Sequence, residues 1–168
     1  MSPRSLPHSH LFRWGAAWTW ITGVLLALIV YYHGGQTLVE GASWGAGPIL
    51  MILVAFLAFL VYDTIWNSGL AANVRAGVIV SFVLLSVIVA LFVYVGHFSY
   101  RATLIHTGAL LGTTMAFNVW FRIWPAQQKI IRAVKNGEPP DAGLVKVAGL
   151  RSRHNTYMSL PLLWAMIG

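Results

Sequence analysis

Cysteine is absent from the 168 residues of this chain. Covalently attached c-type haem, iron–sulfur clusters, thiolate zinc sites and disulfide bonds all require cysteine, so none of them can form within it. Redox chemistry in this chain would therefore rest on a non-covalently held haem b, or on a metal held by histidine, methionine and carboxylate.

Charge is scarce as well. Only 9% of the residues are charged and 58% are hydrophobic, whereas a soluble domain carries about 25% charged residues. This composition predicts an integral membrane protein. Of the four acidic residues only Glu138 and Asp141 share a segment, the inner-loop stretch NGEPPDAG, so we expect no close carboxylate pair for acid–base catalysis. It also contains no HExxH zinc motif and no phosphate-binding loop.

Four apolar stretches of about 20 residues follow one another, and each is long enough to cross a bilayer as a helix. We therefore expect an all-α integral membrane protein with about four transmembrane helices, in a single membrane domain that covers residues 1–168. The expected spans are 14–33, 47–66, 75–97 and 102–124.

The region after the fourth span is expected to form an inner loop, 125–153. Within it, PAQQKIIRAVKNG has the pattern of a short amphipathic helix on the cytoplasmic membrane surface, and NGEPPDAG ends that helix. A partner-binding helix is the competing interpretation. The terminal apolar segment, 155–168, would rise about 21 Å as a helix, short of a hydrocarbon layer of about 30 Å, so we expect a C-terminal half-span that cannot cross alone.

The basic residues predict the orientation. With a cytoplasmic N-terminus, only Arg101 of the eleven basic residues lies outside, as the positive-inside rule requires of a multi-pass protein. The net charge of +7 is then explained by contact with anionic lipid headgroups, and no nucleic-acid partner is expected. The basic residues on the inner side would be Arg4, Arg13, Arg75, Arg122, Lys129, Arg132, Lys135, Lys146, Arg151 and Arg153.

Three histidines share the outer side of this topology. His33 and His97 end the first and third spans, where each is either an interfacial residue or a cofactor ligand. His106 lies inside the apolar stretch TLIHTGALLGTTM, where an ionisable group usually faces a partner or a cavity. It is either a ligand of haem or metal, or the donor of an interhelical hydrogen bond. A haem between His106 and His33 or His97 is geometrically easier than one shared with His154, on the opposite side.

Two glycines follow His106 on the same expected helix. Gly108 and Gly112 form a G-x-x-x-G pair, which lets another helix approach closely. Tight helix packing is one interpretation, and room for a flat porphyrin beside its histidine ligand is the other. Both interpretations place this helix at the centre of the domain.

A polar set gathers on the inner side. Asp63 is the only acid within a span, and Asn118 and Arg122 lie one turn apart at the end of the fourth span. A buried aspartate normally takes a basic partner, so this set is either a charge-paired lock between helix ends or a proton path or anion pocket. The candidate partners of Asp63 are Arg122, Arg151, Arg153 and His154.

Two motifs carry a resemblance to a known family. HTGALLGTTMAFNVWFRIWPAQQK and the later RSRHNTYMSLPLLWAMI resemble the membrane domain of the PuuD-type urate hydroxylases of bacteria, the urate oxidase N-terminal domain family. WGAAWTWITG and the VYD at 61–63 are similar to further parts of that family, so the resemblance extends from Trp14 to Ile167. Residues on the family's pattern are His106, Gly108, Ala109, Gly112, Asn118, Val119, Pro125, Gln127, Arg151, Ser152, His154, Asn155, Tyr157, Leu160 and Pro161.

The resemblance implies a location and a chemistry. It implies a bacterial cytoplasmic (inner) membrane protein, in a family whose membrane domain oxidises urate and passes electrons to an attached cytochrome c domain. It adds Gln127, Asn155 and Tyr157 to the candidate polar cluster of Asp63, Asn118 and Arg122. The candidate cofactor ligands remain His106, His97, His33 and His154, although His33 and His97 do not fall on the family's pattern.

Two functions stay open at this point. The chain is either a redox component, with haem b or a metal at His106 and a separate cytochrome c as electron acceptor, or a non-catalytic accessory subunit of a larger respiratory or photosynthetic membrane complex. The preceding helix and the cytochrome domain of the family do not appear in these 168 residues. We therefore expect the working unit to include other membrane subunits or further protein segments.

Overall fold

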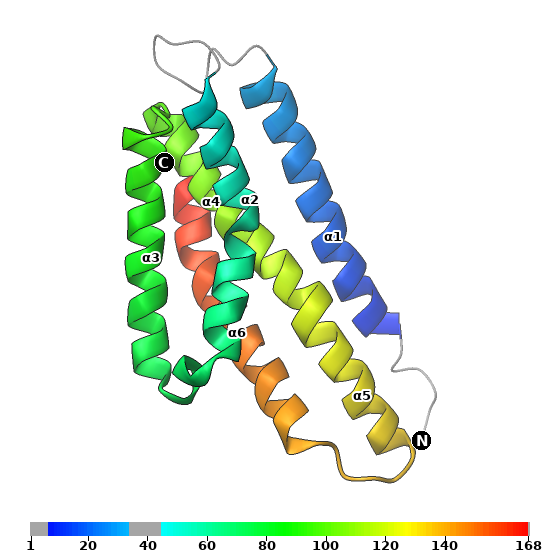
Figure 1. Cartoon of the computed structure of the whole chain (residues 1–168). Helices are drawn as coiled ribbons and strands as arrows, with labels where there is room; N and C mark the ends of the chain where they lie inside the picture. The colour runs from blue at the N-terminus through cyan, green and yellow to red at the C-terminus, as the bar shows by residue number, and fades with distance from the viewer. Residues whose placement is uncertain (1–6, 34–44, 168) are drawn as a thin grey trace.

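The protein is described by a computed structural model that places residues 7–33 and 45–167, with the side chains of all but 7–12 and 71. In this part of the chain the secondary structure is helical, which confirms the predicted all-α class (Figure 1). The elements are α1 (Pro7–Ala27), a π-helical turn (Leu28–Tyr32), α2 (Ala46–Asn67), a 3-10 turn (Gly69–Ala72), α3 (Val74–Tyr94), α4 (Tyr100–Asn118), a second π-helical turn (Val119–Ile123), α5 (Trp124–Lys135) and α6 (Ala142–Ile167).

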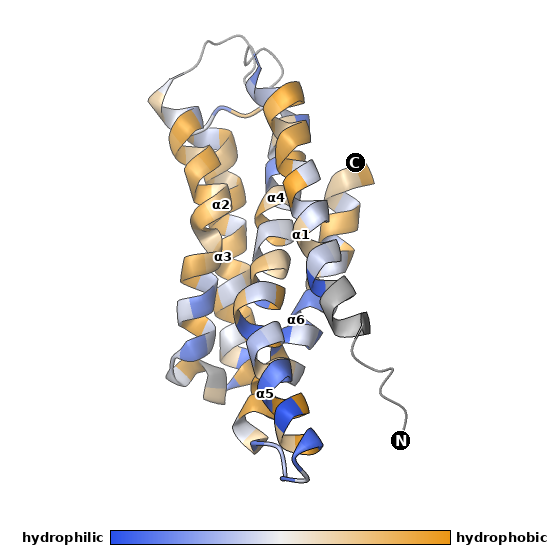
Figure 2. Ribbon diagram, turned by 90° about the vertical axis from the view of Figure 1, so that its right-hand side faces the viewer, coloured by the Kyte–Doolittle hydropathy of each residue, from blue (hydrophilic) through white to orange (hydrophobic). Residues whose placement is uncertain are grey.

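Three of these helices are long and apolar enough to cross a membrane: Arg13–Tyr32, Ala46–Asn67 and Val74–Tyr94. They overlap the residues of the first three predicted spans. Figure 2 shows hydrophobic residues along α2 and α3, and hydrophilic residues gathered around α5 and the adjoining part of α6. Large apolar side chains point outward along all three helices, among them Trp18, Leu57 and Phe82. Such a surface suits a hydrocarbon environment.

The fourth predicted span, 102–124, forms α4 and the π-helical turn that follows it. α4 is less apolar than the other spans because it lies at the centre and contacts α1, α2, α3 and α6. Thr103, Thr113 and Thr114 are buried and Thr107 is half-buried. Thr107 and Thr114 donate their hydroxyls to the backbone oxygens of Thr103 and Leu110. A polar side chain is tolerated inside a membrane protein when it is bonded in this way.

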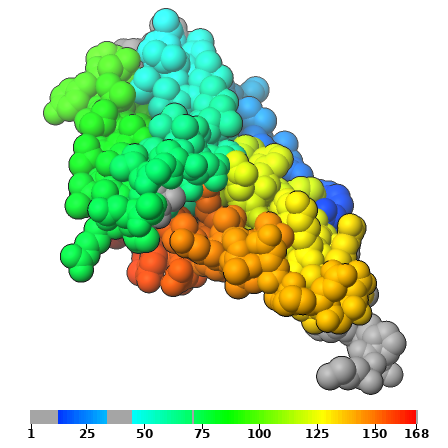
Figure 3. All heavy atoms as spheres, turned by 60° about the horizontal axis from the view of Figure 1, so that its bottom comes forward, coloured from blue at the N-terminus to red at the C-terminus, as the bar shows by residue number. Residues whose placement is uncertain are grey.

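The predicted inner loop, 125–153, differs from the structure in its extent. Only residues 136–141 separate α5 from α6, and α4 continues into α5 as one long slanting helix (Figure 1). The π-helical turn makes this continuation possible: Trp124 N–H bonds to Val119 O, five residues back, directly before Pro125, which has no N–H to donate. The predicted amphipathic helix is therefore present as α5, but it extends α4 outward (Figure 3).

The terminal segment also belongs to a longer element than expected. Its residues from Asn155 onward form the second half of α6, which packs along α4. A Cβ atom on Gly108 would lie 3.8 Å from the Ala165 Cβ, and one on Gly112 would lie 3.5 Å from Leu162 Cδ1. The G-x-x-x-G pair therefore faces α6, and its role in the structure is helix packing.

Candidate functional site

His106 lies in the second turn of α4, and its side chain is buried, with 1% exposed. Its Nδ1 lies 2.7 Å from the backbone oxygen of Ala102. A carbonyl only accepts hydrogen bonds, so Nδ1 carries the proton and Nε2 presents a lone pair. That lone pair accepts the hydroxyl of Tyr32, at 2.8 Å. Both ring nitrogens of His106 are therefore engaged within the chain.

Aromatic rings enclose this histidine. The ring of Phe98 lies 4.5 Å from the imidazole, centroid to centroid, and the rings of Tyr32, Tyr31 and Phe92 lie at 5.7, 6.1 and 6.1 Å. These rings come from the end of the first span, from α3 and from the connection between α3 and α4. We call His106, Tyr31, Tyr32, Phe92 and Phe98 the histidine cage.

The other two histidines predicted on this side do not join the cage. His33 is exposed and directly follows the π-helical turn, while the preceding residue, Tyr32, makes the contact to His106. His97 is exposed in the connection between α3 and α4, with a left-handed backbone at φ 51°. The ends of the first span and of α3 do lie beside His106, but tyrosine and phenylalanine side chains, and not His33 or His97, surround its ring.

A haem or a metal at His106 would need a free Nε2 atom and open space beside the imidazole ring. The tautomer of His106 is the one found in many metal-bound histidines, with Nδ1–H donated to a backbone oxygen. However, Tyr32 holds Nε2, and α6 covers the glycine face of α4. The described residues contain no group of three or more histidine, aspartate or glutamate side chains that could hold a metal ion. In this arrangement the cage does not fit a haem at His106.

The predicted polar cluster lies in the other half of the bundle and is centred on Asp63 of α2. Arg122 binds both carboxylate oxygens, through Nε at 2.8 Å and through Nη2. Arg151 of α6 donates to Asp63 Oδ1 at 3.0 Å and to Asn67 Oδ1 at 3.1 Å. Arg151 is 1% exposed, and its guanidinium carbon lies 5.0 Å from the ring centroid of Tyr62. Asp63 thus joins α2, α6 and the turn after α4.

A chain of hydrogen bonds extends from this ion pair. Asn118 donates its amide to Tyr62 Oη at 3.1 Å and to Asn155 Oδ1 at 3.0 Å. The hydroxyl of Tyr62 then donates to His154 Nδ1 at 2.7 Å. Asn155 donates to the backbone oxygen of Met115 at 3.0 Å. We call Asp63, Arg122, Arg151, Asn118, Asn155, Tyr62 and His154 the polar lock.

His154 occupies a specific place in the lock. It belongs to α6, outside the three apolar spans, and its ring packs 4.1 Å from that of Trp66. Burial, with smaller contributions from the charges of Arg151 and Arg153, lowers the pKa of His154 to about 4. His154 is therefore neutral at physiological pH, and its Nδ1 accepts a hydrogen bond from the Tyr62 hydroxyl.

Two predicted members lie outside the lock. Tyr157 is 68% exposed on α6, and Gln127 is half-buried on α5. In the described part of the chain neither one bonds to Asp63 or its partners. The sequence analysis did not identify Tyr62 and Asn67 as neighbours of the ion pair. Both lie within one helical turn of Asp63, and this spacing could have identified them.

The comparisons with known proteins give one positive result. No curated protein and no solved structure matches the chain. A family model described as urate oxidase N-terminal matches residues 1–168. This match covers the cage and the lock alike, and it agrees with the motifs around His106 and His154. The chain belongs to the urate oxidase N-terminal family.

Proposed function

We propose that this chain is a membrane subunit of an oxidoreductase of its family, and that its own contribution is structural: it holds helices together and supports neighbouring subunits. One observation carries the proposal. Both ring nitrogens of His106, the best candidate ligand, are bonded within the chain, at 2.7 and 2.8 Å. The cage thus has the properties of a satisfied core site, in which every polar atom of the histidine has a partner.

The polar lock supports the same interpretation. Arg122 and Arg151 share one carboxylate, and the remaining donors of Asn118 and Asn155 are satisfied by neighbouring helices. A buried charge with all its partners present stabilises one arrangement of helices. An anion pocket would instead require cationic donors without a carboxylate partner. Arg151 is 1% exposed, and Arg122, although 37% exposed, is paired with both carboxylate oxygens of Asp63.

The outer surface fits a subunit that works among others. α3 buries only Gly77, Ile88 and Phe92, so most of its apolar surface remains for lipid or for membrane partners. A larger respiratory or photosynthetic complex would supply such partners. For the location we propose a bacterial inner membrane with a cytoplasmic N-terminus, supported by the ten basic residues on one side of the predicted topology.

A second candidate function is a redox role at His106. The observation that favours it is the tautomer, because Nε2 carries the lone pair that a haem b iron or a metal would need. Tyr32 would have to leave Nε2 in that case. Electrons would then pass to a cytochrome c, as the family resemblance implies. His154 is a weaker ligand candidate, since its Nδ1 accepts the hydroxyl of Tyr62.

An activity measurement on the assembled complex separates the two candidates. The tagged chain would be purified in mild detergent with its natural partners, and urate-dependent reduction of cytochrome c would be followed. We expect a His106→Gln variant that still assembles to keep at least about a third of the activity. Activity lost more than about a hundredfold in a fully assembled His106→Gln complex would contradict the structural role and support the redox role. An Asp63→Asn variant serves as the comparison, because we expect it to fail at assembly.

A further inference from the structure

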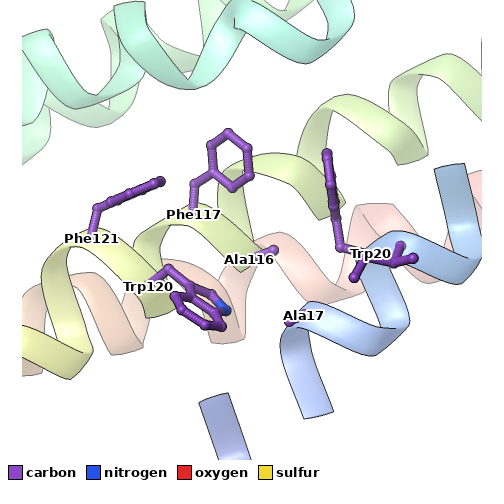
Figure 4. Close-up of a pocket in the computed structure, with 7 residues that line it drawn as sticks. Ala17, Trp20, Ala116, Phe117, Trp120 and Phe121 are labelled. Atoms are coloured by element: carbon purple, nitrogen blue, oxygen red, sulfur yellow. The ribbon is translucent and has the colours of Figure 1, made fainter. Parts of the chain in front are cut away.

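An apolar groove runs between α1 and the end of α4 (Figure 4). Its volume is about 200 Å³, and its lining consists of hydrophobic side chains, chiefly those of Trp20, Phe117, Trp120 and Phe121. Two alanines, Ala17 and Ala116, face each other across it, and their small side chains leave the space open. The groove is therefore a site for an apolar chain rather than for a polar molecule.

A cation lies at one end of this groove. Arg13 precedes Ala17 by one helical turn, and its guanidinium carbon lies 4.6 Å from the ring of Trp120 and 4.5 Å from the ring of Trp124. Trp120 also lines the groove, so the cation and the apolar lining are continuous. Aromatic faces hold a guanidinium in place without neutralising its charge.

The charge of Arg13 is not balanced within the described residues. Both ion pairs there involve Asp63, which is already shared by Arg122 and Arg151. The Arg13 Nε atom is buried and has no hydrogen-bond partner. The site thus combines a fixed, uncompensated cation with an adjoining apolar groove, which is complementary to a molecule with an anionic head and a hydrocarbon tail.

We propose that this groove binds an anionic phospholipid, with the phosphate at Arg13 and an acyl chain between α1 and α4. Arg13 lies on the side predicted to be cytoplasmic, where anionic lipids are concentrated. A membrane quinone would fill the apolar groove equally well but would leave Arg13 without a counter-charge, and a zwitterionic lipid would bring a second cation beside its phosphate. The bound lipid would complete the contact between α1 and α4, which is left open along the groove.

The test measures lipid binding to the full chain in mild detergent by native mass spectrometry. Phosphatidylglycerol and phosphatidylcholine with identical acyl chains are compared, with inorganic phosphate as a separate ligand. We expect phosphatidylglycerol to be retained preferentially, and Arg13→Gln to weaken its binding about fivefold, as the loss of one basic contact predicts. Ala17→Leu should weaken both lipids because it fills the groove, and inorganic phosphate alone should not bind.

Matched variants keep the test decisive. Arg13→Lys retains the charge and should retain the preference for phosphatidylglycerol, even if Arg13→Gln fails to fold. Arg101→Gln removes a basic residue from the opposite side, and Ala90→Leu enlarges an exposed position on α3, so neither should affect binding. Equal retention of both lipids by the parent chain, unchanged binding in Arg13→Gln and Ala17→Leu, or displacement of phosphatidylglycerol by a quinone would overturn the proposal.

Discussion

At the scale of single residues, Asp63 holds two arginines that differ in exposure. The side chain of Arg151 is 1% exposed and that of Arg122 is 37% exposed. Removing a carboxylate from a buried pair leaves an uncompensated charge, and the cost depends on how well water can reach that charge. The energetic cost of losing the Asp63 carboxylate is therefore far larger at Arg151 than at Arg122.

Asp63→Asn should lower the free energy of unfolding by about 3 kcal/mol, because Arg151 then remains buried with no counter-charge. Thermal unfolding in mild detergent, followed by circular dichroism, measures this loss. Adding Arg151→Gln to Asp63→Asn should recover part of it, whereas adding Arg122→Gln should recover little. Glu138→Gln, at an exposed acidic residue, is the control. Equal effects of Asp63→Asn and Glu138→Gln would show that the lock does not stabilise the fold.

His154 makes the stability depend on pH. Its pKa is lowered to about 4 in the folded protein, below the ordinary value of 6.5, mainly by burial and then by Arg151 and Arg153. The unfolded chain therefore takes up the proton first as the pH falls. The stabilising contribution is complete above pH 6.5 and is lost as the pH falls towards 4. As the pH is lowered over this range, the melting temperature should fall more steeply for the parent chain than for His154→Gln. An equal pH dependence of the two melting temperatures would contradict this assignment.

The residues of the lock were partly predictable from the sequence. Asp63, Asn118 and Arg122 are polar groups within apolar stretches, and such groups need partners in a membrane. Tyr62 and Tyr32 could not be identified in the same way, because tyrosine is common near the ends of spans whether or not its hydroxyl has an internal partner. The distances that join these tyrosines to His154 and His106 depend on helix packing, which no sequence spacing reveals.

At the scale of the elements, small residues determine how closely the helices approach. A Cβ atom on Gly47 would lie 2.3 Å from the backbone oxygen of Val95. The start of α2 and the end of α3 therefore meet with no room for a side chain at this position. Gly23, near the end of α1, has no neighbouring atom within 4 Å of such a Cβ atom.

Gly47→Ala should destabilise the protein by about 2 kcal/mol, because the backbone of one helix end must move to relieve the clash. Gly23→Ala should be neutral or slightly stabilising, since alanine favours helix more than glycine does. Thermal unfolding of the two variants under identical conditions provides the comparison. A Gly47→Ala variant as stable as Gly23→Ala would mean that α2 and α3 do not approach each other this closely.

Element boundaries were harder to predict than element existence. The sequence located the three long apolar helices, the less apolar α4 and the break at 136–141, since hydrophobic length and Gly–Pro clusters are strong signals. It ended the fourth span at 124 and placed a separate surface helix from Pro125 onward, where α4 in fact continues into α5; proline is common at the first position of a helix. The π-helical turn before Pro125 lets the helix continue through the proline, and apolar periodicity does not reveal such a turn.

At the scale of the whole molecule, α4 is the axis on which both candidate sites depend. It carries His106 towards one end and Asn118 towards the other, while α1, α2, α3 and α6 pack around it. Much of α4 is buried, so the first family motif lies largely in the interior. α6 presents one face to α4, with Arg151 and Ala165 buried, and leaves Tyr157 and Leu160 exposed on the other.

The proposed structural role of this chain requires the histidine cage to be closed to a haem. The most direct measurement is a reduced-minus-oxidised visible spectrum of the purified, folded chain after incubation with excess haem b, beside a Tyr32→Phe variant. We predict no b-type α band in the parent chain, because Tyr32 occupies the lone pair of His106. A stoichiometric b-type band in the parent chain that disappears in His106→Ala would contradict the account and identify His106 as a haem ligand.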